Sequence, residues 1–168
     1  MSHDGFLVVM GTAGTGKSEI GRRLSERLHC AFVEADDLHA PDSVAQMRQG
    51  IPLSDAQREP WLQAVCERAI SVPTRPVVIA CSALKRSYRD LMRTRLGPVR
   101  FLFLDGSPEL IAARLTARQG HFASISLLES QLRTLERPDA SEQAVVLDIA
   151  QPADVVVTKA IQAVSPGL

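Results

Sequence analysis

The sequence predicts an α/β protein in which a five-stranded, mostly parallel sheet is flanked by helices on both faces. Three observations predict this class. Short apolar runs with many β-branched residues recur along the 168 residues, as in strands buried on both faces. Segments with a helical spacing of apolar residues separate these runs. A Gly-rich segment at 11–18 joins the first run to the first helix, so the chain opens with a strand, a loop and a helix.

The first half of the chain alternates expected strands with expected helices. The strands cover 6–10, 31–33 and 77–81, and the helices cover 17–29, 41–49 and 54–70. The first helix carries an apolar residue at every fourth position from Ile20 to Leu28, which gives it one buried stripe. Pro41 suits the start of the second helix, and Ser54 caps the third. These units predict right-handed βαβ crossovers.

The second half continues the alternation. Its strands cover 101–104 and 145–147, and its helices cover 88–96, 108–118, 127–135 and 154–164. Ser107 as N-cap and Pro108 at the first helical position open the helix over 108–118. Segments 34–40 and 119–126 lack such patterns and are expected to be irregular. No repeat or linker interrupts the chain, which predicts a single domain over residues 1–168.

Composition excludes several classes of protein. Nineteen basic and nineteen acidic residues give zero formal charge, which argues against a nucleic-acid partner and against a polybasic membrane binder. The apolar run at 6–10 is too short to span a bilayer, and no basic residue precedes it as in a signal peptide. The three cysteines form no C-x-x-C pair, so neither a disulfide framework nor a zinc site is expected, and a cytoplasmic location is predicted.

The segment 11–18, Gly-Thr-Ala-Gly-Thr-Gly-Lys-Ser, is a complete G-x-x-x-x-G-K-S motif. Its expected nucleotide contacts come from Gly11, Gly14, Thr15, Gly16, Lys17 and Ser18. The glycines let backbone N–H groups point at phosphate oxygens, and the helix that follows adds its positive dipole end. Lys17 neutralises charge on the β- and γ-phosphates, and the Ser18 hydroxyl is a ligand for Mg²⁺. The motif predicts a nucleoside triphosphate but not the acceptor.

Charged side chains follow the second and third strands. Glu34, Asp36, Asp37 and His39 cluster after the second strand, where one carboxylate can take a hydroxyl proton and another can orient water on Mg²⁺. The alternative is a solvated acidic turn. After the third strand, Lys85, Arg86 and Arg89 suit an anionic substrate or the phosphates, and the alternative is a solvated helix entry.

The segment at 118–127 is a candidate lid. Arg114, Arg118, Gly120 and His121 lie in or next to it, and a segment that carries arginines can close over a triphosphate and exclude water. The alternative is an ordinary surface helix end, where arginines interact favourably with the helix dipole.

Taken together, these motifs resemble the gluconokinase family of small P-loop kinases, which are related in fold to shikimate kinases. The likeness spans nearly the whole chain, and its blocks lie at 11–18, 36–39, 47–53, 55–62, 80–85, 88–91, 117–122, 130–136 and 148–152. The blocks between 36 and 85 are specific to this family rather than to P-loop kinases at large. The resemblance implies a three-layer P-loop kinase fold, a substrate-side helical region at about 38–72 and a homodimer.

The resemblance also implies an activity: transfer of the γ-phosphoryl group of ATP, with Mg²⁺, to the 6-hydroxyl of D-gluconate. Asp36 falls where related kinases hold the acceptor hydroxyl, and Glu34 falls near the Mg²⁺ waters. The expected catalytic residues are therefore Lys17, Asp36 and Arg118, and Arg114 and Arg118 are expected at the nucleotide. The candidates for substrate binding are Asp36, His39, Arg48, Lys85, Arg89 and His121.

Two other functions remain open on the sequence. One is a kinase for another small hydroxy or sugar acid, because the motif specifies the donor and not the acceptor. The other is a nucleotide-binding module without activity. The presence of Lys17, Ser18 and Asp36 together argues against the inactive module.

Overall fold

One parallel sheet organises the computed structural model, which describes residues 5–117 and 122–164. Its strands are β1 (Phe6–Met10), β2 (Ala31–Glu34), β3 (Val77–Ala80), β4 (Val99–Asp105) and β5 (Val145–Asp148). They lie in the order β2-β3-β1-β4-β5, and every neighbouring pair is parallel. The predicted sheet is confirmed. Because β1 is central, the loop that follows it lies at the middle of the carboxyl edge, where α/β folds bind ligands.

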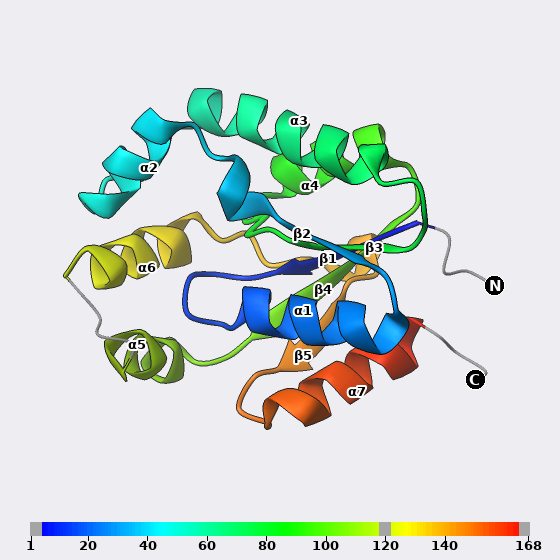
Figure 1. The fold of residues 1–168 in the computed structure, drawn as a ribbon. Coiled ribbons are helices and arrows are strands. Elements are labelled where there is room, and N and C mark those ends of the chain that lie inside the picture. The colour runs from blue at the N-terminus through cyan, green and yellow to red at the C-terminus, as the bar shows by residue number, and fades with distance from the viewer. Residues whose placement is uncertain (1–4, 118–121, 165–168) are drawn as a thin grey trace.

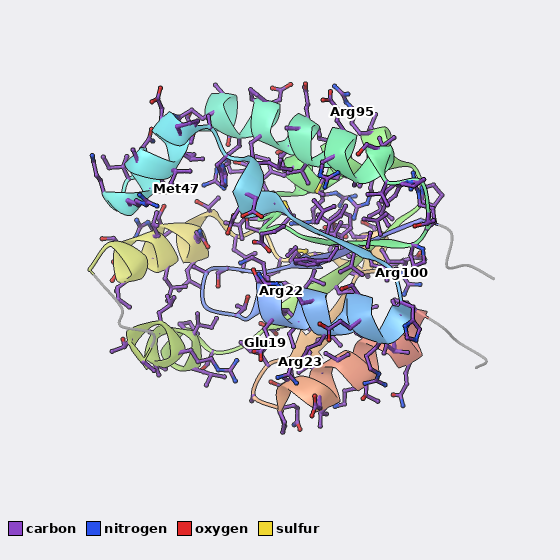
Figure 2. The ribbon with its side chains drawn as sticks, viewed as in Figure 1. Glu19, Arg22, Arg23, Met47, Arg95 and Arg100 are labelled. Carbon is purple, nitrogen blue, oxygen red and sulfur yellow. The ribbon has the colours of Figure 1, made fainter. Side chains whose placement is uncertain are left out.

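Helices cover both faces of the sheet (Figure 1). They are α1 (Lys17–Leu28), α2 (Pro41–Arg48), α3 (Asp55–Ser71), α4 (Arg86–Leu96), α5 (Pro108–Ala117), α6 (Phe122–Thr134) and α7 (Ala153–Val164). Two short 3₁₀ helices, η1 (Ala35–Leu38) and η2 (Ala140–Glu142), complete the described chain. α3 and α4 lie on one face, and α1 and α7 lie on the other. Arg23 of α1 pairs at the surface with Glu19 of the same helix, both labelled in Figure 2, and its second pair, with Asp154, joins α1 to α7.

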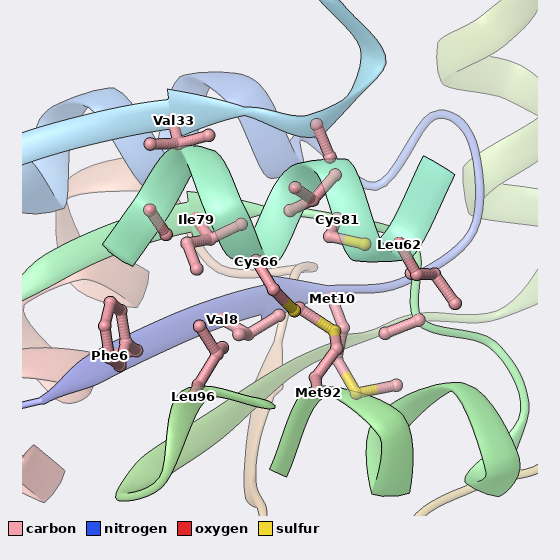
Figure 3. Packing of buried hydrophobic residues seen from close by; sticks show 14 of the residues in the cluster. Phe6, Val8, Met10, Val33, Leu62, Cys66, Ile79, Cys81, Met92 and Leu96 are labelled. Carbon is pink, nitrogen blue, oxygen red and sulfur yellow. The ribbon is translucent and has the colours of Figure 1, made fainter. Parts of the chain in front are cut away.

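The period-two alternation of β1 divides the core into two layers. Phe6, Val8 and Met10 pack toward α3 and α4, whereas Leu7 and Val9 pack toward the layer of α1, α5 and α7. Figure 3 shows the first layer, in which Cys66 of α3 and Met92 of α4 meet the strand residues. All three cysteines are free, as expected. None of the described helices is long and apolar enough to cross a membrane.

Two expectations about irregular segments were wrong. Residues 35–38 form the 3₁₀ helix η1, and α6 begins at Phe122, so most of the segment expected to be irregular at 119–126 is helical. The serines of this segment suggest a loop, but Ile125, Leu128 and Leu132 recur at helical spacing and pack against the core. The rest of the predicted lid, including Arg118, Gly120 and His121, lies outside the described residues.

Candidate active site

The loop between β1 and α1 has the backbone of a phosphate-binding loop. Gly14 and Gly16 adopt left-handed conformations, with φ of 84° and 92°. A Cβ on Gly14 would lie 2.7 Å from Cγ of Leu115, so α5 leaves no room for a side chain there. Thr15 is buried, and its hydroxyl donates to the Thr12 carbonyl at 2.8 Å. The Thr15 side chain therefore braces the loop from within.

Lys17 and Ser18 form the first turn of α1. The Lys17 ammonium donates to the Thr12 carbonyl at 3.0 Å, so it lies over the loop that it follows. The Ser18 hydroxyl donates to Oε2 of Glu34 at 2.8 Å and links the loop to the end of β2. Burial raises the pKa of the Glu34 carboxyl, and the hydrogen bond from Ser18 opposes that shift.

The Ser18–Glu34 pair fits a magnesium ion. A hydroxyl and a carboxylate are hard oxygen donors, which Mg²⁺ prefers. Among the described residues no group of three or more His, Cys, Asp or Glu side chains could hold a metal. An ion bound here would therefore complete its coordination with phosphate oxygens and water, as Mg²⁺ does at nucleotide sites.

Asp36 stands at the same edge of the sheet, in η1. Its side chain is 71% exposed, whereas that of His39, whose Nε2 lies 3.5 Å from Oδ1 of Asp36, is 5% exposed. The hydrogen bond with His39, together with the positive charge of Lys17, lowers the pKa of the Asp36 carboxyl. Asp36 is thus an accessible carboxylate that stays ionised at neutral pH and can accept a proton.

Trp61 of α3 packs against His39 and the backbone of η1. Its ring stacks on the His39 ring with 4.1 Å between centroids, and its indole N–H donates to the Ala35 carbonyl at 2.7 Å. Nδ1 of His39 is buried and has no hydrogen-bond partner among the described residues. The long helix α3 therefore fixes both His39 and the backbone that carries Asp36.

Lys85, a predicted substrate contact, lies in an ionic cluster at the start of α4. Its ammonium is 3.0 and 3.2 Å from the two carboxylate oxygens of Asp55, which also accepts a hydrogen bond from the Tyr88 hydroxyl. The bonds from Tyr88 and Lys85 lower the pKa of the Asp55 carboxyl. The structure thus gives Lys85 a carboxylate partner on α3.

Arg58 is a cation that the sequence motifs did not single out. Its residue is only 8% exposed, and its guanidinium lies 5.6 Å from the centroid of the Tyr88 ring. Nε donates to the Leu53 carbonyl at 3.3 Å, and no carboxylate of the described chain forms an ion pair with it. Arg58 lies three residues before Trp61 on α3, so both point to the same face. That spacing and the place of Arg58 in the family block at 55–62 were the available signals.

Arg89, a predicted substrate contact, has all of its donors occupied by the fold. The residue is 0% exposed. Its Nε and Nη2 donate to the two oxygens of Glu142 at 2.6 and 3.0 Å, and its remaining N–H groups reach the carbonyls of Ala83, Leu84 and Glu136. Arg89 instead ties the segment before α4 to η2. Its partner Glu142 lies 53 residues away in sequence, so the pattern around Arg89 could not reveal the pair.

Two further predicted contacts, Arg114 and Arg48, lie within the described residues, whereas Arg118 and His121 lie outside them. On α5, Nη2 of Arg114 donates to the Ile149 carbonyl at 2.5 Å, which places Arg114 at the loop between β5 and α7. Arg48 is exposed at the end of α2. A contact that the motifs missed comes from α6, where Oε1 of Gln131 accepts a hydrogen bond of 2.6 Å from the Ala13 N–H.

Comparisons with known proteins agree with this geometry. A family model described as an AAA domain matches residues 6–138. The chain is 39% identical to the thermoresistant gluconokinase of Escherichia coli (strain K12), over 99% of this chain and 97% of that protein. The crystal structure of a gluconokinase from Sinorhizobium meliloti 1021 superposes with a TM-score of 0.88 at 44% identity, and covers 98% of this chain and 94% of that one. Shikimate kinase from Acinetobacter baumannii shares the fold, with a TM-score of 0.61 at 16% identity over 95% of this chain and 92% of that one.

Proposed function

This chain belongs to the gluconokinase family, and from that premise we propose that it transfers the γ-phosphoryl group of ATP to the 6-hydroxyl of D-gluconate. The products are 6-phospho-D-gluconate and ADP. The observation that carries the proposal is that Lys17, at the end of the phosphate loop after β1, and the exposed carboxylate of Asp36, just after β2, lie at the same edge of the sheet, where the charge of Lys17 favours the ionised form of Asp36. A phosphate-binding cation beside an ionised carboxylate is the pair that phosphoryl transfer to an alcohol requires.

Each residue of this pair has a distinct task. Asp36 accepts a hydrogen bond from the 6-hydroxyl and orients its oxygen toward the γ-phosphorus. The new oxygen–phosphorus bond forms, the bond to the ADP oxygen breaks, and the hydroxyl proton passes to Asp36. Lys17 neutralises charge on the phosphate oxygens as the bond breaks. Ser18 would hold Mg²⁺ directly and Glu34 would hold it through water, and the ion would supply further charge neutralisation.

The substrate is an anion, and the side of the site formed by α3 and α4 supplies cations. Arg58 of α3 is only 8% exposed, and among the described residues only its Nε has a hydrogen-bond acceptor, so its remaining donors make it our candidate for the gluconate carboxylate. Lys85 lies next to the same Tyr88 ring. His39, which contacts Asp36, and Arg48 complete the expected contacts within the substrate-side region at about 38–72.

The residues that we expect to contact ATP, beyond the phosphate loop, follow from the family likeness and from the position of Arg114. Arg114 lies on α5 four residues before Arg118, which lies outside the described residues. We propose that Arg114 and Arg118 contact ATP, and that His121 contacts gluconate from a lid over about 118–127. The same likeness supports a homodimer. The free and mostly buried cysteines fit a cytoplasmic location, where thiols stay reduced.

Acceptor-dependent release of ADP tests the proposed function. The purified protein is assayed with ATP and Mg²⁺ against gluconate, other aldonic acids and shikimate. We expect gluconate to give the highest kcat/KM. A higher value with another acid would reassign the acceptor, and nucleotide binding without ADP release from any acid would indicate an inactive module.

A further inference from the structure

The peptide between Thr12 and Ala13 is held from both sides. Its carbonyl, from Thr12, accepts hydrogen bonds from the Lys17 ammonium at 3.0 Å and from the Thr15 hydroxyl at 2.8 Å. Its N–H, from Ala13, donates to Oε1 of Gln131 at 2.6 Å. In a planar trans peptide the C=O and N–H bonds point in opposite directions. Gln131 and Lys17 therefore form hydrogen bonds with opposite sides of one planar peptide group.

Gln131 is itself firmly placed, because the end of α6 is anchored to the segment before α4. Glu136 lies two residues after the end of α6, and its N–H donates to the Leu84 carbonyl at 2.8 Å. Its side chain accepts from the Arg86 N–H at 3.0 Å, and its carbonyl accepts from Arg89 at 2.9 Å. The same segment reaches the phosphate loop directly, where the Gly11 N–H donates to the Ser82 carbonyl. Figure 1 shows α6 alongside the loop between β1 and α1.

We propose that Gln131 is a positioning residue for phosphoryl transfer, and that it acts on Lys17 through the Thr12–Ala13 peptide. By holding the Ala13 N–H, it fixes the rotation of the peptide and so keeps the Thr12 carbonyl directed at the Lys17 ammonium. The ammonium is then held over the loop before ATP arrives, and no reorganisation is needed during the reaction. This inference rests on the proposed kinase activity.

A carboxamide suits this position better than a carboxylate. Both offer an oxygen to the Ala13 N–H, but glutamate would add a negative charge beside a loop that must bind a triphosphate. The proposal therefore separates two properties of residue 131. The acceptor oxygen controls the geometry of the loop and of Lys17, and neutrality protects the affinity for ATP.

The first test uses the protein without nucleotide. Amide hydrogen exchange of Ala13, followed by NMR, is compared in the wild type and in Gln131→Met, which has a similar length but no oxygen. We expect the Ala13 amide to exchange at least tenfold faster in the variant. Gln131→Glu keeps the acceptor and is expected to retain the protection. Equal exchange in the wild type and Gln131→Met would overturn the proposal, as would loss of protection in Gln131→Glu.

The second test is a double-mutant cycle with Lys17. Gln131→Met is expected to lower kcat about tenfold, with the dissociation constant of ATP changed less than threefold and the melting temperature within a few degrees. In a Lys17→Ala background it is expected to lower kcat by less than twofold, because its effect passes through Lys17. Losses that multiply in the double variant, or an unchanged kcat in the single one, would refute the coupling. Gln131→Glu is expected to raise the KM for ATP severalfold while kcat stays near the wild-type value.

Glu129→Met is the matched control, since Glu129 is exposed on the same helix and is expected to leave kcat within twofold. Failure of the proposed kinase function can be distinguished from failure of the proposal for Gln131. A wild type that forms no product from gluconate refutes the proposed function, whereas the Ala13 exchange experiment still decides whether Gln131 holds the loop.

Discussion

Removing the charge of Glu142 should destabilise the whole fold, because Glu142 is the buried partner of a buried arginine. Its side chain is 1% exposed, as is that of Arg89, and Arg93 also donates to it at 2.8 Å. The hydrogen bonds and charges of these arginines lower the pKa of Glu142 from 4.5 to about 2. At about 1.4 kcal/mol per pKa unit, this corresponds to roughly 3 kcal/mol of stability. Breaking a buried ion pair by removing one partner costs a similar amount, about 3–5 kcal/mol.

The substitution is Glu142→Gln, and the assay is urea unfolding at pH 7 together with thermal unfolding. We expect the free energy of unfolding to fall by roughly 3 kcal/mol and the melting temperature by about 6 to 12 °C, at 2 to 4 °C per kcal/mol for a domain of this size. The matched control is Asp154→Asn, which breaks the exposed pair with Arg23 and is expected to have little effect.

The pH dependence provides a second check on Glu142. Its folded-state pKa lies below the unfolded value, so its contribution is complete above about pH 4.5 and is lost as the pH falls toward 2. The wild type should therefore lose more stability over this range than Glu142→Gln does. A variant as stable as the Asp154→Asn control, or one with the full acid sensitivity of the wild type, would refute the reasoning.

Three further predictions concern catalysis, and steady-state kinetics with equilibrium binding of ATP and gluconate tests all of them. Lys17→Ala should lower kcat about a hundredfold or more with the fold intact, the scale of losing one stabiliser of developing charge, and near-normal turnover would contradict its role. Asp36→Asn should lower kcat by about two or more orders of magnitude while ATP binding is nearly unchanged. An equal loss of ATP binding would move Asp36 to the metal. Arg58→Met should raise the KM for gluconate about tenfold or more and leave the KM for ATP unchanged, since a buried charged hydrogen bond is lost. Unfolding without a kinetic change would make Arg58 purely structural.

Local patterns were enough to predict the parts of the fold that are built from neighbouring residues. β1, the phosphate loop and α1 follow one another along the chain, and the glycines at 14 and 16 occupy the left-handed positions that the motif requires. The capping box of Ser54 and Gln57 likewise starts α3 at the expected residue. In these cases each residue's environment is set by its immediate sequence neighbours.

Residues whose environment comes from distant segments were assigned less well. Arg89 was expected at the substrate because it follows a strand, but the Glu142 carboxylate of η2 and the Glu136 carbonyl, two residues after α6, accept hydrogen bonds from it. Arg58 and Gln131 lie in the family blocks at 55–62 and 130–136, but the sequence assigned neither of them a role. Only the packing of α3 against Tyr88, and of α6 against the phosphate loop, distinguishes them.

The proposed transfer is tested most directly by identifying its product. The wild-type protein is incubated with ATP, Mg²⁺ and ¹³C-labelled gluconate, and the product is examined by ¹³C and ³¹P NMR. We predict one phosphate ester on carbon 6, formed together with one ADP. No ester, an ester at another carbon, or ADP formed at the same rate without gluconate would contradict the assignment of Lys17 and Asp36 to phosphoryl transfer onto the 6-hydroxyl.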